Sequence, residues 1–238
     1  MSSDEPAPAA QRRTVTTHRA VKADRTVKTR RTVKIGITGP IGCGKSTILG
    51  WLAARGALVI DADHVAREVT APGSPLVAEI VAGFGSAVAG PNGSLDRAAL
   101  AAIVFNDPAE LRRLESITHP VIRRRILEQI GSAETTGVPF VALEAIRLVE
   151  GGYPGLLDEV WLVTCDPPAQ RSRLAARGLG LVDTQARIDA QADLLVRARA
   201  VATRVIDTSG TPAVTEAAVD RALQGARARA GRGDHGKA

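Results

Sequence analysis

The sequence predicts a three-layer α/β fold in which a parallel five-stranded sheet is covered by helices on both faces. Two observations predict this fold. Five short apolar runs, each the length of one strand, alternate with longer segments of helical periodicity. The first run leads directly into a glycine-rich turn that opens a helix. With 238 residues, of which 45% are hydrophobic, the chain can bury the core that such a sheet requires.

The first strand, Val33 to Ile37, ends at the segment around which the chain is organised. Residues 39–46 read Gly-Pro-Ile-Gly-Cys-Gly-Lys-Ser and match G-x-x-x-x-G-K-[ST], a loop whose backbone N–H groups wrap polyphosphate. A helix from Lys45 to Arg55 points the positive end of its dipole at the phosphates. Lys45 adds a mobile cation, and the Ser46 hydroxyl can ligate Mg²⁺. The alternative, a fortuitous match in a glycine-rich turn, is disfavoured by the flanking strand and helix.

A second strand, Ala57 to Ile60, ends in Asp61-Ala62-Asp63. Ligands of open α/β sheets sit at the carboxyl ends of the strands, so these acids are expected beside the phosphate. Asp63 is therefore a candidate catalytic or substrate-binding residue. It is equally a candidate N-cap for the following helix, and both roles can hold at once.

The middle of the chain is predicted to be mostly helical. Helices are expected over Pro75–Phe84, Asp96–Phe105, Pro108–Ile117 and Pro120–Ile130, with a turn at Pro91-Asn92-Gly93. So much helix between two parallel strands exceeds one crossover connection. Residues 64–131 are therefore interpreted as an inserted, substrate-binding helical lobe.

Three further strands complete the sheet: Val138–Leu143, which ends at Glu144, then Glu159–Thr164 and Arg204–Ile206. The last is followed by a helix from Pro212 to Leu223.

The segment between the fourth and fifth strands is interpreted as a lid, over residues 167–200. It combines a helix from Pro167 to Arg177, a flexible break at 178–180 and a second helix from Asp183 to Arg199. Arg173 and Arg177 lie on one face of the first helix, where they can bring positive charge onto a transferring phosphate. A solvated basic face is the alternative, and the sequence does not separate the two.

The two ends of the chain carry its positive charge. Residues 1–34 contain 9 Lys/Arg and 3 Asp/Glu, and residues 225–238 contain 4 and 1, although the whole chain has a net charge of only +6. Residues 1–32 are predicted to be a disordered basic extension, and residues 225–238 a flexible tail. With 3% aromatic residues there is little to stack on bases, which argues against nucleic-acid binding.

Other compositional features point to a cytoplasmic protein that has no contact with a membrane. No apolar run approaches the roughly 20 residues that cross a bilayer. Two cysteines, Cys43 and Cys165, are too few for a disulfide framework and suit a reducing compartment.

With these elements in place, the chain resembles the dephospho-coenzyme A kinase family over residues 34–224. The matching segments are Ile35–Thr47, Asp61–Val69, Pro72-Gly73, Leu95-Asp96-Arg97, Phe105, His119-Pro120, Arg173-Leu174, Arg177-Gly178, Ala186-Arg187-Ile188 and Gln191. The Asp-Ala-Asp element and the His-Pro pair are more specific than the phosphate loop itself. The resemblance implies a P-loop kinase-like fold with an inserted helical substrate lobe and a helical lid.

The implied reaction is ATP-dependent phosphorylation of the ribose 3′-hydroxyl of dephospho-coenzyme A, which yields coenzyme A. The implied catalytic residues are Asp63, Lys45 and Arg173, with Asp63 accepting the hydroxyl proton. Mg²⁺ is the implied cofactor, held with ATP at Ser46. ATP is assigned to Gly39, Ile41, Gly42, Cys43, Gly44, Lys45, Ser46, Thr47 and Arg177. The acceptor is assigned to Thr38, Asp63, Arg67, His119, Glu144 and Arg147.

Departures from the family pattern leave acceptor identity open. Ile146-Arg147 stands where the family has Pro-Leu, and a cation near the acceptor pocket could alter how the substrate is seated. Thr203 and Thr208 replace a typical Asp and Asn. Cys43 replaces Ser or Ala, either as a small residue or as a reactive thiol.

The alternative function is a kinase of the same scaffold that phosphorylates a different small-molecule hydroxyl. A GTPase and a transporter ATPase are disfavoured, because the sequence lacks N-K-x-D and Leu-Ser-Gly-Gly-Gln motifs. A non-enzymatic nucleotide-binding module would not need Asp63 together with lid arginines. The oligomeric state is not predicted.

Overall fold

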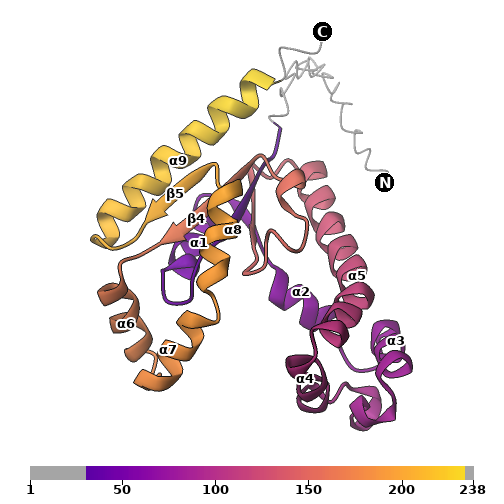
Figure 1. Cartoon of the computed structure of the whole chain (residues 1–238). Helices are drawn as coiled ribbons and strands as arrows, with labels where there is room; N and C mark the ends of the chain where they lie inside the picture. The colour runs from indigo at the N-terminus through magenta and orange to yellow at the C-terminus, as the bar shows by residue number, and fades with distance from the viewer. Residues whose placement is uncertain (1–30, 234–238) are drawn as a thin grey trace, which may run out of the picture.

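The computed structural model of this chain describes residues 31–233 and contains the predicted parallel sheet of five strands. The strand order is β2-β3-β1-β4-β5, so the strand that leads into the phosphate loop lies in the centre (Figure 1). The strands are β1 (Val33–Thr38), β2 (Ala57–Asp61), β3 (Phe140–Glu144), β4 (Glu159–Thr164) and β5 (Arg204–Asp207).

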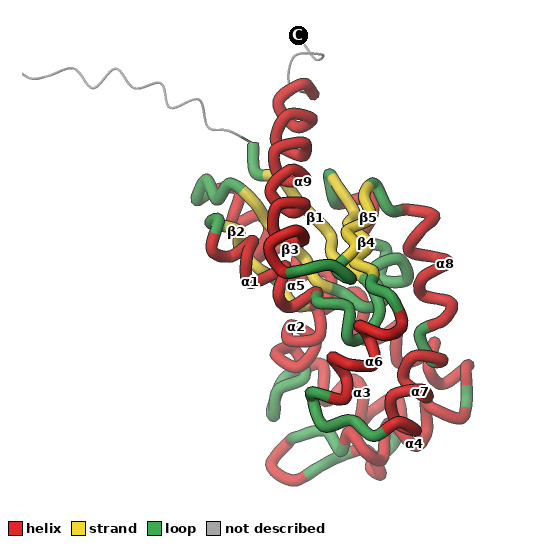
Figure 2. The backbone as a smooth tube through the Cα atoms, turned by 90° about the vertical axis from the view of Figure 1, so that its left-hand side faces the viewer, coloured by secondary structure: helices red, strands yellow, loops and turns green. Residues whose placement is uncertain are grey.

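Helices cover both faces of the sheet, as expected for three layers. On one face lie α1 (Lys45–Ala54) and α9 (Pro212–Gly233), which pack on alternate strand residues such as Ile35 and Trp161. On the other face lie α5 (Pro108–Thr135) and α8 (Ala192–Val201), around residues such as Leu143. This alternation follows from the two-residue period of a strand, which sends neighbouring side chains to opposite faces. Figure 2 shows the strands between these helices.

The inserted lobe is helical and has a small core of its own. It consists of α2 (Ala62–Val69), α3 (Pro75–Phe84), α4 (Arg97–Asn106), two short 3₁₀ turns (Ser86–Val88 and Pro91–Gly93) and the first part of α5. Leu76, Ile80, Val88 and Leu100 form the buried centre of this lobe. The lobe projects away from the sheet (Figure 1).

The structure divides two helical segments differently from the predictions. Pro108–Ile117 and Pro120–Ile130 are one helix, α5, with Pro120 inside it. Pro120 lacks an N–H and cannot donate to the preceding turn, but tertiary packing of α5 against the lobe and the sheet maintains the helix. The single helix predicted over Asp183–Arg199 is instead α7 (Leu181–Asp189) and α8, which are separated at Ala190-Gln191.

The lid region therefore has two parts. The helices α6 (Pro167–Ala175) and α7 form an arm that projects from the sheet on the side opposite the lobe, and we call these two helices the lid arm (Figure 1). Helix α8 instead packs on β4. A 3₁₀ turn, Pro154–Leu156, lies between β3 and β4.

The predicted flexible tail from residue 225 is wrong for residues 225–233, which continue α9. Ala226 is 2% exposed in the sheet core, and the Arg229 guanidinium bonds the buried Glu159 carboxylate. The Gly/Arg-rich composition does not predict these contacts, because they are made to residues of the sheet that are distant in sequence. Residues 234–238 and residues 1–30 of the predicted extension lie outside the described residues. Thr32, assigned to that extension, is buried and donates a hydrogen bond to the Val138 carbonyl.

No helix within residues 31–233 is long and apolar enough to cross a membrane.

Candidate active site

Acidic and hydroxyl side chains meet at the carboxyl edge of the sheet. Glu144, the last residue of β3, is in register with Asp61 of β2 on one side and with Ile37 of β1 on the other. Thr38 ends β1 and leads into the phosphate loop. Because of this register, the acidic residues that end β2 and β3 lie at the same edge of the sheet as the start of the phosphate loop.

The phosphate loop is held in its conformation by three glycines. Gly39, Gly42 and Gly44 have φ angles of 149°, 81° and 84°, which other residues rarely adopt. A Cβ atom on Gly39 would also collide with the Val163 carbonyl of β4. The loop can therefore curl back over the sheet edge only with glycine at this position.

Lys45 lies inside this loop rather than in solvent. Its side chain is buried, and its ammonium donates to the carbonyls of Gly39 (2.8 Å) and Pro40 (3.2 Å). Burial lowers the pKa of Lys45, and the nearby Arg177 adds to this effect, whereas Glu144 and Asp63 oppose it. Burial likewise raises the pKa of Glu144, helped by Asp61 and Asp63 and opposed by Lys45. These charges thus act on one another across a single site.

The structure separates the roles of the two aspartates after β2. The Asp61 carboxylate is the N-cap of α2 and accepts hydrogen bonds from the N–H groups of Asp63 (2.8 Å) and His64 (3.1 Å). Asp63 is therefore not needed as the cap. It lies exposed in the first turn of α2, close enough to influence the pKa values of Lys45 and Glu144.

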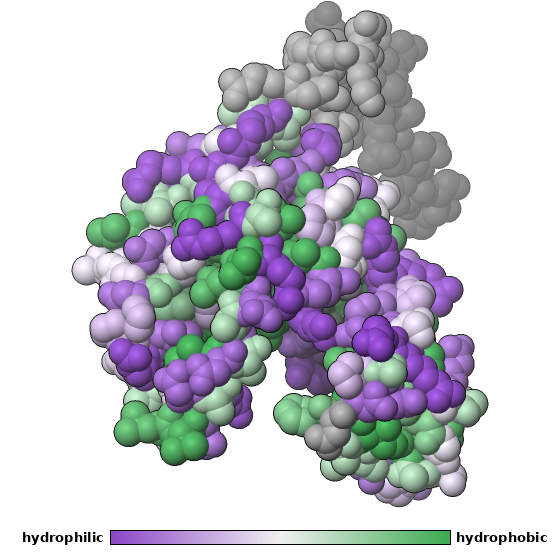
Figure 3. All heavy atoms as spheres, viewed as in Figure 1, coloured by the Kyte–Doolittle hydropathy of each residue, from purple (hydrophilic) through white to green (hydrophobic). Residues whose placement is uncertain are grey.

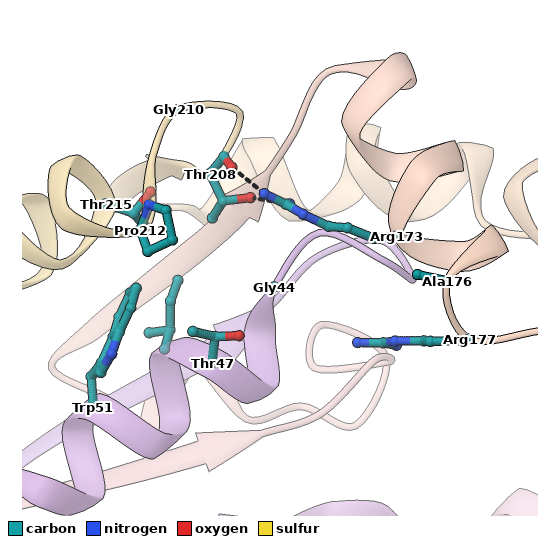
Figure 4. Close-up of a pocket in the computed structure, with 11 residues that line it drawn as sticks. Gly44, Thr47, Trp51, Arg173, Ala176, Arg177, Thr208, Gly210, Pro212 and Thr215 are labelled. Carbon is teal, nitrogen blue, oxygen red and sulfur yellow. Dashed lines mark hydrogen bonds between the residues drawn. The ribbon is translucent and has the colours of Figure 1, made fainter.

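A cavity of about 350 Å³ lies beside the phosphate loop (Figure 4). Arg173 and Arg177 reach toward it from the end of α6, and the Arg173 guanidinium donates to the Thr208 hydroxyl (2.9 Å) and carbonyl (2.6 Å). The other lining residues are Gly44, Thr47, Ile48, Trp51, Ala176, Thr208, Gly210, Pro212 and Thr215. Of the predicted ATP-binding residues, Gly44, Thr47 and Arg177 line this cavity, together with the predicted catalytic residue Arg173.

Sequence reasoning missed several residues of this site. Trp51 on α1 and Pro212 at the start of α9 form one end of the cavity. The only signal for Trp51 was its position less than two turns beyond the loop lysine, on the helix that the motif opens.

Two glutamines hold the phosphate loop from the lid region. The side-chain carbonyl of Gln191 accepts a hydrogen bond from the Ile41 N–H (2.7 Å), and the Gln170 amide donates to the Ile41 carbonyl (2.8 Å). Ile41 was predicted to bind ATP, and both of its backbone groups are occupied by these side chains. The two glutamines are 150 and 129 residues from Ile41 in sequence, so no local pattern could reveal these contacts.

A wide hollow lies between the lobe and the lid arm (Figure 3). Arg67 is exposed on α2, and His119 is half-buried on α5. Thr38 is buried at the base, where its hydroxyl donates to the Ile146 carbonyl (3.2 Å). Arg147, which stands where the resembled family has leucine, forms an ion pair with Glu115 of α5 (2.6 Å). Its charge is therefore matched within the protein.

Ser46 is the residue that the sequence predicts to ligate Mg²⁺. Within residues 31–233 the structure contains no group of three or more His, Cys, Asp or Glu side chains that could hold a metal ion. Ser46 is exposed in the first turn of α1. A hydroxyl next to bound phosphates, with carboxylates opposite, suits Mg²⁺, which takes only one or two protein ligands and otherwise phosphate and water oxygens.

The two cysteines are joined by a disulfide between Cys43 in the phosphate loop and Cys165 just after β4. From the sequence, the two cysteines are interpreted as suited to a reducing compartment. The sequence gives no sign of this pairing, since the two residues are 122 positions apart.

Comparisons with known proteins agree with this geometry. A family model described as dephospho-CoA kinase matches residues 33–213. The dephospho-CoA kinase of Moorella thermoacetica is 46% identical over 194 residues, which cover 80% of this chain and 90% of that protein. The crystal structure of TT1252 from Thermus thermophilus matches with a TM-score of 0.66 and 36% identity, over 84% of this chain and 98% of that one.

A solved dephospho-CoA kinase from Campylobacter jejuni matches with a TM-score of 0.59 at 25% identity, over 80% of this chain and 95% of that chain. The family model spans the sheet, the phosphate loop, the lobe and the lid arm, so the match is to the whole catalytic unit. The chain therefore belongs to the dephospho-CoA kinase family.

Proposed function

We propose that this chain transfers the γ-phosphoryl group of ATP to the ribose 3′-hydroxyl of dephospho-coenzyme A, with Asp63 accepting the hydroxyl proton. As a member of its family the chain is an ATP-dependent kinase, and the end product of this reaction is coenzyme A. The family match does not favour the alternative acceptor. The ion pair of Arg147 with Glu115 also weakens the main argument for that alternative, since this cation already has a partner.

The observation that carries the mechanism is that Asp61, and not Asp63, is the N-cap of α2. Because Asp61 caps α2, the Asp63 carboxylate stands at the sheet edge free of that role and electrostatically coupled to Lys45. A carboxylate there can orient an incoming hydroxyl and take its proton as the phosphoryl group arrives.

The donor side supplies positive charge. The polyphosphate is assigned to the phosphate loop and the N-terminus of α1, at Gly39, Gly42, Cys43, Gly44, Lys45, Ser46 and Thr47. The Ile41 N–H already donates to Gln191, so it is not counted among these donors. The Lys45 ammonium exchanges its carbonyl partners for phosphate oxygens when ATP enters. Arg173 and Arg177, at the cavity beside this loop, neutralise charge on the transferring group.

Mg²⁺ is the proposed cofactor, with Ser46 as its protein ligand. When bound, it would offset negative charge on the phosphates. The half-buried Glu144 carboxylate also opposes the lowering of the Lys45 pKa.

The acceptor is proposed to occupy the hollow between the inserted lobe and the lid arm. Thr38 and Glu144 would form its base, with Arg67 and His119 on the lobe side. Arg147 is assigned to the rim, where its bond to Glu115 ties the segment after β3 to α5. The binding of dephospho-coenzyme A rests on the family match and on this arrangement.

A cytoplasmic location is proposed from membership of this family of biosynthetic kinases. No nucleic-acid partner is proposed. The sequence between the two basic ends carries a net negative charge, which does not favour a polyanion.

The experiment is turnover of the full chain with ATP and dephospho-coenzyme A, compared for wild type and Asp63→Asn. We expect Asp63→Asn to lower kcat by about 100-fold or more, with little change in ATP affinity, because only the proton acceptor is lost. Asp107→Asn, at the N-cap of α5, is the matched control and should stay near wild type. Full activity of Asp63→Asn would refute the assigned base. Faster turnover of another hydroxyl compound would refute the acceptor.

A further inference from the structure

The Cys43–Cys165 disulfide connects two parts of the active site. Cys43 lies in the phosphate loop between Gly42 and Gly44, and Cys165 lies between β4 and the lid helix α6. Their Cα atoms are 5.2 Å apart, a spacing typical of a disulfide. Both sulfur-bearing side chains pack into the core on the α1 and α9 side of the sheet.

The loop end of this bond is part of the nucleotide-binding machinery. The Cys43 carbonyl accepts a hydrogen bond from the Thr208 hydroxyl (2.9 Å), and the same hydroxyl accepts one from Arg173. Two glycines with positive φ flank Cys43. The disulfide therefore crosslinks the loop at a position whose neighbours on both sides must be glycine.

The other end of the bond is the root of the lid arm. Asp166, directly after Cys165, is the N-cap of α6 and accepts a hydrogen bond from the Ala169 N–H (2.7 Å). Helix α6 then carries Gln170, which holds Ile41, and Arg173, which lines the cavity. The disulfide thus ties the phosphate loop to the segment from which α6 begins.

The cysteine content allows only one intramolecular pairing. The sequence has two cysteines, and both are in this bond. Disulfides in a reducing compartment are usually transient and regulatory rather than structural. A domain of this size with three apolar clusters does not depend on a crosslink for its core.

We propose that Cys43 and Cys165 form a reversible redox modification site that controls lid closure. In the disulfide form the root of α6 is fixed to the phosphate loop, and closure over bound ATP is slowed. In the dithiol form this covalent link is absent, only hydrogen bonds such as that of Gln170 to Ile41 join the two segments, and turnover is fast. The proposal rests on the proposed kinase function, because lid closure is measured through turnover.

The chemistry is a balanced thiol–disulfide exchange with a low-molecular-weight thiol. A thiolate of the reductant attacks the Cys165 sulfur, which is more exposed than Cys43 (1% exposed), and the Cys43 thiolate leaves and takes up a proton. A second reductant thiolate attacks the reductant sulfur of this mixed disulfide and releases Cys165 as a thiol. Two reductant thiols are thereby oxidised to one disulfide. Oxidation of the enzyme by a low-molecular-weight disulfide is the reverse sequence.

The test measures thiols and turnover on the same samples of the full chain. Wild type is equilibrated with reduced or oxidised dithiothreitol, alkylated with a maleimide mass tag and assayed with ATP and dephospho-coenzyme A. We expect no tagged thiols in the oxidised sample and two in the reduced sample. The oxidised sample should have a kcat at least about five-fold lower, with a much smaller change in ATP affinity.

Cys165→Ser is the matched control, because it removes the bond without touching the phosphate loop. We expect its kcat to equal that of reduced wild type and to be the same in both redox conditions. Cys165→Ala serves as a second variant if the serine form folds poorly. Equal turnover of oxidised and reduced wild type overturns the redox proposal, as does an equal redox response in the Cys165 variants. Loss of turnover in the reduced enzyme would instead refute the kinase function.

Discussion

At the scale of single residues, the site depends on charges that are kept partly out of water. Lys45 and Glu144 have pKa values shifted by burial in opposite directions, so each is destabilised in its charged form and stabilised by the other. Such an arrangement is common at functional sites and costs folding stability. This loss of folding stability can be measured, because the free energy of unfolding then depends on pH.

We predict that Glu144→Gln stabilises the empty protein increasingly as the pH rises. The Glu144 pKa is raised on folding, so its protonated form favours the folded state at low pH, and this contribution disappears as the pH rises through the folded pKa. The substituted glutamine does not titrate. The difference in thermal midpoint between Glu144→Gln and wild type should therefore grow from pH 4 to pH 8.

The control for this experiment is Glu128→Gln, an exposed carboxyl on α5. Its difference from wild type should vary little with pH. A thermal-midpoint difference for Glu144→Gln that shrinks as the pH rises would contradict the burial assigned to this carboxyl. Turnover should fall in Glu144→Gln, since Lys45 loses a neighbouring carboxylate that opposes the lowering of its pKa.

At the scale of elements, the lid arm is the part that the proposed function requires to close over ATP. It projects from the sheet and is joined to the phosphate loop by Gln170 and to the β5–α9 loop by Arg173. Leu181 and Val182 at the start of α7 are 82% and 83% exposed, and Phe105 on the lobe is 89% exposed. Both the lid arm and the lobe thus expose apolar side chains to water.

We predict that Arg173→Ala lowers kcat by at least about ten-fold while ATP affinity changes much less. Closure removes water and strengthens the contact of the guanidinium with the transferring phosphoryl group, so the loss should appear mainly in the transition state. Arg177→Ala should behave similarly. Steady-state kinetics and direct ATP titration separate the two effects.

Arg171→Ala is the matched control, because Arg171 is exposed on the same helix and does not line the cavity. If Arg173→Ala weakens ATP binding by the full factor and leaves kcat unchanged, the arginine anchors the ground state. If neither value moves, α6 presents only a solvated basic face.

At the scale of the whole molecule, a buried carboxylate links the sheet to its last helix. Glu159 at the start of β4 is 2% exposed and bonds the Trp161 indole N–H (2.6 Å), Arg204 (3.3 Å) and Arg229. These bonds hold the pKa of Glu159 below its usual range despite burial. Arg229 lies in the part of α9 that composition alone marked as a tail.

We predict that shortening the chain after residue 224 destabilises it by about 3 kcal/mol relative to a chain that ends at residue 233. The cut removes Arg229 and leaves a buried carboxylate with one fewer partner, and it also removes the buried Ala226. Urea unfolding at pH 7 measures the difference. Equal midpoints and slopes would show that residues 225–233 add nothing to the fold.

The elements of the sheet were predictable because their signals are local. Each strand is a short apolar run, and β4 has the predicted bounds, Glu159–Thr164. The phosphate loop is identified by glycines whose backbone conformation is itself the function. The helix predicted from Asp96 is α4, and Asp96 is its N-cap, a local signal because a cap acts within three residues.

What the sequence did not reveal depends on contacts between distant segments. The bonds of Gln170 and Gln191 to Ile41, the Cys43–Cys165 pairing and the docking of Arg229 on Glu159 all join residues at least 70 positions apart. The continuity of α5 through Pro120 has the same origin, because packing on both sides outweighs the local penalty. The composition of residues 225–233 therefore predicted a flexible tail where the structure has a helix. The glycine pattern of the phosphate loop, in contrast, correctly predicted the loop conformation.

The position of Trp51 gives the protein an intrinsic optical signal. The chain has two tryptophans and one tyrosine, so its ultraviolet emission comes mainly from two indoles. Trp161 is fully buried in the sheet, and its emission changes only when the core opens. Trp51 lies on the wall of the cavity beside the phosphate loop, where an arriving base would displace water from the ring. Ligand entry and loss of the native core can thus be followed separately by fluorescence, without attaching a dye.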